Sequence, residues 1–302
     1  MRATVRKRPS LSSFMNNDNV VGYVFAAPFL IGFFCLTLVP MGLSLFYSLC
    51  NYKIAAVPEL IGFKNYIDLF HDANFGNSLL VTLQYVAVGV PLKLVFALLI
   101  AMLLTRPTRL QGLYRAVYYI PSLIGGSVAV ALVWKQLFGS RGPLVTAIKA
   151  MGATGFSFFG DSRFAFIPLV LCNAWQFGSS MLIFASGLTQ IPEDHHEAAQ
   201  IDGAGSVKRF FSITLPCLSP IILFNLIMQL ISGFMTFTQA QIITQGGPNY
   251  ATNYIALNIF TEGFSYSHMG YACAESWVML IIMAVITGVI FKTSDRWAFY
   301  ES

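Results

Sequence analysis

The sequence predicts an all-α integral membrane protein with six transmembrane helices. Of its 302 residues, 56% are hydrophobic and only 10% are charged, whereas about 25% of the residues in an average soluble domain are charged. The mean hydropathy is +0.67. Long apolar segments alternate with short polar ones, and each apolar segment reaches the roughly 20 residues that a helix needs to cross a bilayer. Membrane lipid is therefore expected to surround most of the chain.

The expected spans follow the apolar segments. They are residues 20–49, 78–104, 116–137, 164–188, 217–243 and 268–291. This pattern predicts an N-terminal segment at 1–19, one membrane domain at 20–291 and a short tail at 292–302. Residues 138–163 and 244–267 are expected to be loops. Residues 191–216, between the fourth and fifth spans, form a long polar segment that we call the polar island.

The distribution of basic residues predicts the orientation. Six spans place both termini and the polar island on one side of the membrane. The segments on that side hold eleven Lys and Arg residues, and the loops on the other side hold five. Because cytoplasmic segments are enriched in Lys and Arg, the termini and the polar island are predicted to be cytoplasmic.

The polar island is too polar to lie in hydrocarbon, where each unpaired charge costs several kcal/mol. It carries six formal charges, on Glu193, Asp194, Glu197, Asp202, Lys208 and Arg209. Good helix formers come first, and Gly203 follows as a residue that can end a helix. The spacing predicts two short helices with a turn near 203–205, closed by Pro216. Such an element would present a shaped, partly apolar surface outside the membrane, suitable for docking another protein.

The polar island also carries a spaced motif. An E-A-A triplet is followed after three residues by glycine, and after nine more residues by I-x-L-P. This motif resembles the cytoplasmic loop in the permease subunits of binding-protein-dependent ABC importers, in particular the maltose-type carbohydrate uptake family. The positions that carry the resemblance are Glu197, Ala198, Ala199, Asp202, Gly203, Ala204, Ile213, Leu215 and Pro216.

Three other segments resemble the same family. They are the G-F-K-N-Y segment at 62–66, the T-Q-G-G-P segment at 244–248 with Thr252 after it, and the run at 181–192 before the polar island. Together these resemblances cover most of the chain. They favour a carbohydrate over an amino acid or a metal as the substrate.

The resemblance implies a fold and a set of partners. The fold would be the type I ABC importer permease, with the polar island as the coupling helix that contacts an ATPase. The partners would be a second homologous permease in a heterodimer, two ATPase subunits, an extracytoplasmic solute-binding protein and a sugar or oligosaccharide. This chain would bind no cofactor and catalyse no reaction, since the partner ATPase would use ATP and Mg²⁺. It would reside in a bacterial or archaeal cytoplasmic membrane.

The fifth span carries a polar stripe. Its members are spaced four, three, four and three residues apart and would share one face of a continuous helix; they are Asn225, Gln229, Ser232, Thr236 and Gln239. One interpretation is that they line a substrate path and offer amide and hydroxyl groups to a sugar. The alternative is that they form hydrogen bonds to a neighbouring helix.

Two charges fall inside expected spans. Glu275 and Lys93 each need a partner or water there, and helix rise separates them by about 10 Å along the membrane normal. Glu275 is predicted either to contact substrate or to make a structural hydrogen bond to a partner subunit. Trp277 is a further candidate, because its ring could stack on a sugar.

Several other functions lack their sequence signals. Residue 200 is Gln, so the H-E-x-x-H zinc motif fails after His196, and the chain has no G-x-x-x-x-G-K-[ST] phosphate loop. No metal site is expected, and the scattered basic residues do not suggest nucleic acid. An integral-membrane transferase or hydrolase and a secondary carrier remain as alternatives. Neither explains the motif of the polar island.

Overall fold

The computed structural model describes residues 18–105, 108–153 and 155–299. The predictions for residues 1–17, for Arg106 and for the last three residues of the tail lie outside this part. The described chain is helical apart from two short strands, β1 (Cys50–Asn51) and β2 (Glu59–Leu60). These strands pair antiparallel, with Cys50 opposite Leu60.

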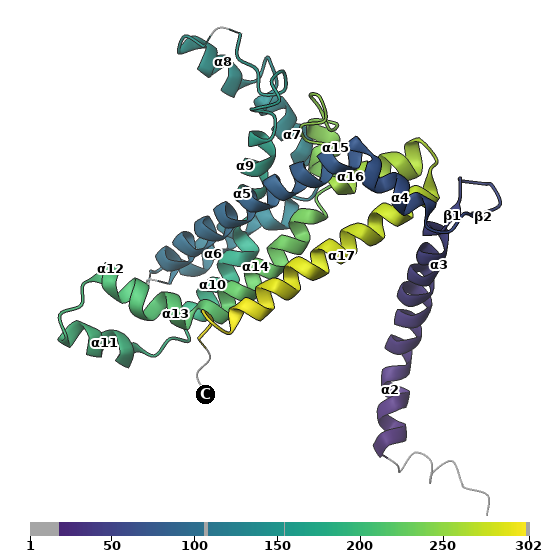
Figure 1. Ribbon diagram of the computed structural model, residues 1–302. Helices are drawn as coiled ribbons and strands as arrows, with labels where there is room; N and C mark the ends of the chain where they lie inside the picture. The colour runs from purple at the N-terminus through teal and green to yellow at the C-terminus, as the bar shows by residue number, and fades with distance from the viewer. Residues whose placement is uncertain (1–17, 106–107, 154, 300–302) are drawn as a thin grey trace, which may run out of the picture.

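The first span stands apart from the others. It runs through α2 (Asp18–Phe33), η1 (Phe34–Leu38) and α3 (Val39–Ser48) as one apolar helix. Figure 1 shows that the C-terminal end of α3 lies beside the other helices and that α2, at the start of the span, lies away from them. Between residues 21 and 38, no side chain is buried by the rest of the described chain. A helix that is apolar on all sides and uncovered requires lipid or another protein around it.

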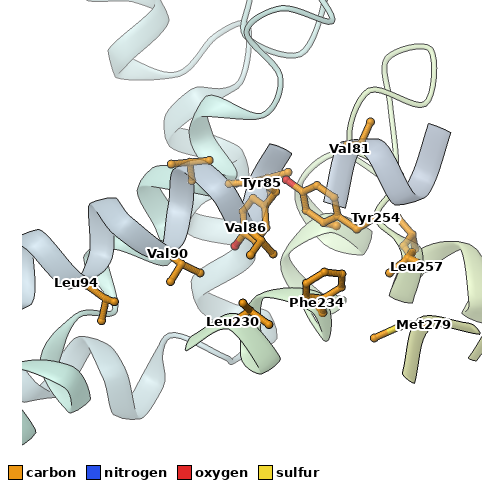
Figure 2. Packing of buried hydrophobic residues seen from close by; sticks show 14 of the residues in the cluster. Val81, Tyr85, Val86, Val90, Leu94, Leu230, Phe234, Tyr254, Leu257 and Met279 are labelled. Carbon is orange, nitrogen blue, oxygen red and sulfur yellow. The ribbon is translucent and has the colours of Figure 1, made fainter. Parts of the chain in front are cut away.

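The centre of the bundle is α5 (Ala73–Leu104), which packs against α9 (Ile167–Trp175), α10 (Gly178–Leu188) and α14 (Ser219–Phe234). Figure 2 shows Val86 and Val90 of α5 on the side that faces Leu230 and Phe234 of α14. Because lipid tails are as apolar as these side chains, such packing depends on close contact between helices. The last helix, α17 (Met269–Ser294), packs along α3 and α14.

The third span is not the single helix that the sequence predicted. It divides into α6 (Gln111–Ile124) and α7 (Val128–Phe138), and the two parts of this span meet at 93°. Gly125 and Gly126 are poor helix formers, and the side chain of Ser127 caps the new helix by accepting from the Val130 amide at 3.4 Å. The segments predicted to be loops at 138–163 and 244–267 also contain helices, since α8 (Pro143–Ala150) lies in the first and α16 (Ile255–Phe260) in the second.

Two further spans are interrupted. The fourth bends by 44° between α9 and α10, at residues 176–177. The fifth stops being helical after α14, and α15 (Thr238–Ile243) follows a three-residue break. Just after the break in the fourth span, α10 packs closely against α6. A Cβ on Gly178 of α10 would lie 2.6 Å from the Tyr118 carbonyl oxygen of α6, so only glycine fits at this position.

The count of spans agrees with the sequence. Within the described residues, four helices are long and apolar enough to cross a membrane, and six spans result if each bent pair counts as one. The predicted all-helical membrane fold is therefore confirmed.

The segments between spans lie at two ends of the bundle. One end holds the polar island, which comprises α11 (Glu193–Ile201), α12 (Ser206–Arg209), η2 (Phe210–Thr214) and the start of α13 (Leu215–Cys217). Figure 1 shows the C-terminal end of α17 at this same end. The opposite end holds the β hairpin and the remaining short helices, α4 (Lys64–His71), α16 (Ile255–Phe260) and η3 (Thr261–Ser265).

Two of the sequence motifs hold this opposite end together. Asn65 of the G-F-K-N-Y segment donates to the carbonyl oxygens of Ser48 at 2.8 Å and Cys50 at 2.9 Å, so it fixes the end of the first span. Thr252 is fully buried, and its Oγ1 lies 2.7 Å from both Thr244 Oγ1 and the Gly247 carbonyl oxygen, within hydrogen-bond distance of each. The glycine–proline turn is thereby held against the end of α15.

Candidate functional site

The turn of the polar island explains the spacing of its motif. Helix α11 ends with a Schellman arrangement, in which the Ala204 amide donates to the Ala199 carbonyl at 2.8 Å and the Gly203 amide donates to the Gln200 carbonyl at 3.1 Å. Gly203 has φ +76°, a left-handed conformation that glycine adopts without strain. The alanine, the glycine four residues later and the alanine after it are thus the residues that build this turn.

The surface of the polar island is exposed and partly apolar. Ile201 is 87% exposed, Val207 72% and Phe211 61%. Acidic and basic side chains surround them on α11 and α12. Arg209 connects the two helices, since its Nη1 donates to Gln200 Oε1 at 3.3 Å.

The polar island returns to the membrane without a break in the helical path. Ile213 and Leu215 are half-buried there, and Thr214 is buried. The prediction that Pro216 closes the element is wrong. Pro216 lies in α13, which follows the π-helical turn η2 without a break, and the chain continues through Leu218 into α14.

The C-terminal segment contacts the base of the polar island. The Phe299 amide donates to Ser219 Oγ at 2.7 Å. Phe299 also lines a cavity of about 240 Å³ together with Gln190, Pro192 and Cys217. The two ends of the polar island and the tail therefore meet at one place.

A second candidate site lies where the three interrupted spans meet. We call this cavity of about 220 Å³ the breakpoint pocket. Its lining includes Gly126 from the break in the third span, Gln176 from the fourth and residues 235–238 from the fifth. The complete lining is Tyr85, Lys93, Gly126, Asn173, Gln176, Ser232, Met235, Thr236, Phe237, Thr238 and Gln239.

Hydrogen bonds connect the walls of the breakpoint pocket. Lys93 Nζ donates to Asn173 Oδ1 at 3.4 Å, which joins α5 to α9. Gln239 Nε2 donates to the carbonyl oxygen of Gly125 at 3.2 Å. In a membrane, backbone groups released by a helix break need such partners or water, so irregular backbone occurs where it lines a cavity. Broken helices of this kind form the polar sites of many transporters.

The predicted polar stripe is only partly reproduced. Ser232, Thr236 and Gln239 line the breakpoint pocket, but Gln239 reaches it from α15 and not from the face of a continuous helix. Asn225 and Gln229 do not line it. Asn225 is buried and donates to the Ile221 carbonyl oxygen at 3.2 Å, and Gln229 is half-buried. The expected single face assumed a regular helix, which the break after Phe234 removes.

Glu275 belongs to a separate buried network. Its Oε1 accepts from Asn258 Nδ2 at 2.9 Å, and Asn253 Nδ2 donates to Asn258 Oδ1 and Ser78 Oγ, both at 3.0 Å. These side chains connect α5, the segment before α16, α16 itself and α17. Glu275 is fully buried, lines none of the cavities described here and makes no ion pair with Lys93.

Trp277 lies at another apolar cavity. This cavity of about 490 Å³ is lined by Met41, Phe237 and Met283 among others. Trp277 is therefore not part of the breakpoint pocket.

Five polar residues were not assigned to the breakpoint pocket from the sequence: Tyr85, Lys93, Asn173, Gln176 and Thr238. Asn173 and Gln176 are three residues apart in the fourth span, and this spacing was a usable signal.

Within the described residues, no group of three or more His, Cys, Asp or Glu side chains is arranged to hold a metal ion.

Comparison with known proteins identifies the family. Residues 73–298 match the model of the binding-protein-dependent transport system inner membrane component. The chain belongs to this family. It is 48% identical over 292 residues to the probable ABC transporter permease protein YesP of Bacillus subtilis (strain 168), covering 95% of this chain and 94% of YesP.

Other relatives agree with this assignment. The permease is 30% identical to the probable starch degradation products transport system permease protein AmyD of Thermoanaerobacterium thermosulfurigenes, over 91% of this chain and 94% of AmyD. Its fold matches a chain in the crystal structure of the bacterial alginate ABC transporter in complex with an alginate pentasaccharide-bound periplasmic protein. That match has a TM-score of 0.78 at 20% identity and covers 95% of this chain and 97% of the other.

The predicted family and role are thereby confirmed. The chain is a permease subunit of a binding-protein-dependent ABC importer and a multi-pass component of the bacterial inner membrane. It is the non-catalytic component, and permeases of this family have no bound cofactor.

Proposed function

We propose that this permease imports a sugar or oligosaccharide that a solute-binding protein delivers at the outer face. The substrate would pass through the breakpoint pocket, and the polar island would dock on an ATPase. The observation that carries the proposal is the polar island itself. It combines a rigid glycine turn with exposed Ile201, Val207 and Phe211 at one end of the bundle.

An exposed apolar cluster on a charged element is suited to a protein groove. Aromatic and aliphatic side chains of this kind are the anchors that dominate binding energy in protein interfaces. The surrounding charges would keep the polar island out of the membrane and orient the encounter. These side chains would insert into a groove on the ATPase, and Glu197 and Asp202 would lie at the rim of that contact.

The sugar assignment is supported by the chemistry of the breakpoint pocket. Its polar walls combine the amides of Asn173, Gln176 and Gln239 with the hydroxyls of Ser232 and Thr236. These groups can donate to and accept from sugar hydroxyls. Two similar proteins, named for the transport of starch degradation products and of alginate, support the same assignment.

The uncovered first span supports a second permease subunit in the complex. Residues 21–38 expose large apolar side chains that no other part of the described chain covers. A homologous permease, in a heterodimer, would cover part of this surface. Two ATPase subunits would then serve the two polar islands.

The orientation follows from charge. The polar island and the end of α17 lie together at one end of the bundle, and the basic residues are concentrated on this side. The positive-inside rule makes this end cytoplasmic, where ATP is available. Both termini would then be cytoplasmic.

The polar island would act as a lever. It continues without interruption into α14, and α14 leads to the break that lines the breakpoint pocket. Closure of the ATPases on ATP would move the polar island and change which end of the pocket is open. Such rigid-body coupling requires two arrangements that the ATPase binds with different affinity.

Gentle co-purification and crosslinking test this proposal. The tagged chain is isolated from native membranes, and a photocrosslinker is attached to a cysteine at Ser206, which is exposed beside the turn. A cysteine at Val57, 89% exposed at the opposite end of the bundle, is the matched control. We expect Ser206→Cys to crosslink to an ATPase and Val57→Cys not to do so. A chain that purifies alone and stays uncrosslinked from Ser206→Cys would contradict the proposal.

A further inference from the structure

We infer that the substrate of this permease is anionic and that Lys93 binds its acid group in the breakpoint pocket. This inference rests on the proposed import function and specifies the substrate class. The observation behind it is a buried cation that lines the pocket and has only a neutral partner.

The surroundings of Lys93 leave its charge uncompensated. Its side chain is 7% exposed and lies inside a membrane-spanning helix, where a charged group is costly unless it is paired or hydrated. The side-chain ion pairs found within the described ranges 18–105, 108–153 and 155–299 join Arg163 to Asp161 and His268 to Glu262, and neither includes Lys93. The buried carboxylate of Glu275 does not pair with Lys93: its Oε1 accepts from Asn258 Nδ2, and its Oε2 has no hydrogen-bond partner in the described part of the chain.

The one hydrogen bond of Lys93 does not account for its charge. The Nζ–Oδ1 distance to Asn173 is 3.4 Å, long for a hydrogen bond from a charged donor, which is typically about 2.7–2.9 Å. An ammonium group has three donors, so two remain for a ligand or water. A neutral donor could make the same hydrogen bond to the Asn173 side-chain oxygen. A purely structural role therefore does not explain why this residue is a lysine.

The position of Asn173 directs the lysine toward the cavity. A Cβ on Gly89 would lie 3.2 Å from Asn173 Nδ2, so the amide nitrogen packs against α5 while its oxygen faces Lys93. Gln176, Ser232 and Thr236 lie around the same cavity. One charged group and several hydroxyl and amide groups together are suited to a sugar that carries an acid.

The acid could be a carboxylate or a phosphate. A lysine acts as a point charge and pairs with either group. The cavity of about 220 Å³ would hold the acidic residue of a saccharide, with the rest of a longer chain outside it. Uronic acid saccharides and sugar phosphates are the two sources to separate.

Uptake into proteoliposomes distinguishes uronic acid saccharides from sugar phosphates as substrates. The complete importer, with its partner permease, ATPase and binding protein, is reconstituted and supplied with ATP inside the vesicles. The probes are trisaccharides of galacturonate, glucuronate and mannuronate, the carboxyl-reduced form of each, and glucose 6-phosphate. The variants are Lys93→Gln, Lys93→Arg and, as a control, Lys135→Gln, which removes a lysine that does not line the breakpoint pocket.

We expect the wild type to take up at least one acidic probe in preference to its carboxyl-reduced form or, for a phosphate, in preference to the neutral saccharides. Lys93→Gln should lower that uptake at least about tenfold, the cost of one buried charge-assisted contact. Lys93→Arg should retain uptake within about threefold, because it keeps the charge. Lys135→Gln should transport as the wild type does.

Other results would overturn the inference. If the wild type takes up carboxyl-reduced probes in preference to acidic ones, the inference is wrong. This comparison uses the wild type alone, so it does not depend on whether a variant folds. An equal loss of acidic and neutral uptake in Lys93→Gln would show that the lysine is structural. If no probe enters and the binding protein fails to stimulate ATP hydrolysis, the import proposal itself is wrong, and this inference is lost with it.

Discussion

The polar island and the breakpoint pocket are encoded in different ways. The polar island is one continuous segment, its turn is built from neighbouring residues, and its docking side chains are exposed. The breakpoint pocket takes its residues from four separate spans, and it lies where the helical structure of three of them is interrupted. The comparison shows that an external contact can be specified locally, whereas an internal polar site requires the tertiary fold.

The two regions should therefore respond differently to substitution. Changes on the polar island alter an exposed surface and should affect the ATPase without unfolding the membrane domain. Changes in the buried polar groups should affect transport and stability together, because their partners would be left without hydrogen bonds.

The largest effect is expected at the turn of the polar island. Gly203→Val should abolish ATP-driven uptake, since a β-branched residue at φ +76° is a genuine conformational outlier. Gly205→Val is the matched control, because Gly205 has φ −67° in an extended conformation and also has open space around it. Uptake in proteoliposomes and the amount of membrane-inserted protein are measured for both. Normal uptake by Gly203→Val would show that the turn at Gly203 is not needed to couple the ATPase to transport.

A somewhat smaller effect is expected at the exposed aromatic residue. Phe211→Asp should weaken binding of the ATPase by about 2 kcal/mol or more, the range of an aromatic anchor in an interface. Val57→Asp introduces the same charge at another exposed apolar residue, in the β hairpin at the opposite end, and should leave that binding unchanged. Titration of the purified ATPase against detergent-solubilised permease measures both. Equal affinities for Phe211→Asp and the wild type would place the ATPase elsewhere.

This difference also explains how far the sequence led. The six spans, the family and the turn at Gly203 depend on local composition and spacing, and the sequence predicted them. The breaks at residues 125–127, 176–177 and 235–237 were not predicted, because glycine and polar residues also occur within regular membrane helices. Without the breaks, Gln239 was placed on one face of a continuous helix with Asn225, and Asn173 was not linked to Lys93. The breaks depend on contacts between distant segments, such as the bond from Gln239 to the Gly125 carbonyl.

The smallest effect is expected in the buried network outside the pocket. Glu275→Leu should lower stability by about 1–3 kcal/mol, because the side-chain amide of Asn258 loses its acceptor. Glu275→Gln keeps an oxygen in that position and should cost less than about 1 kcal/mol. Thermal unfolding in detergent gives both values, and competition between substrates should show unchanged preference for Glu275→Gln. A changed preference would place Glu275 in contact with substrate.

The central claim is that the polar island controls access to the breakpoint pocket. A cysteine replaces Thr236, a pocket residue, in a background without the five native cysteines. The rate of its reaction with a water-soluble thiol reagent is then measured in the complete importer, with and without a nonhydrolysable ATP analogue. We predict that nucleotide changes this rate at least about tenfold, and that adding Phe211→Asp removes the change. The same rate in both nucleotide states would contradict the account.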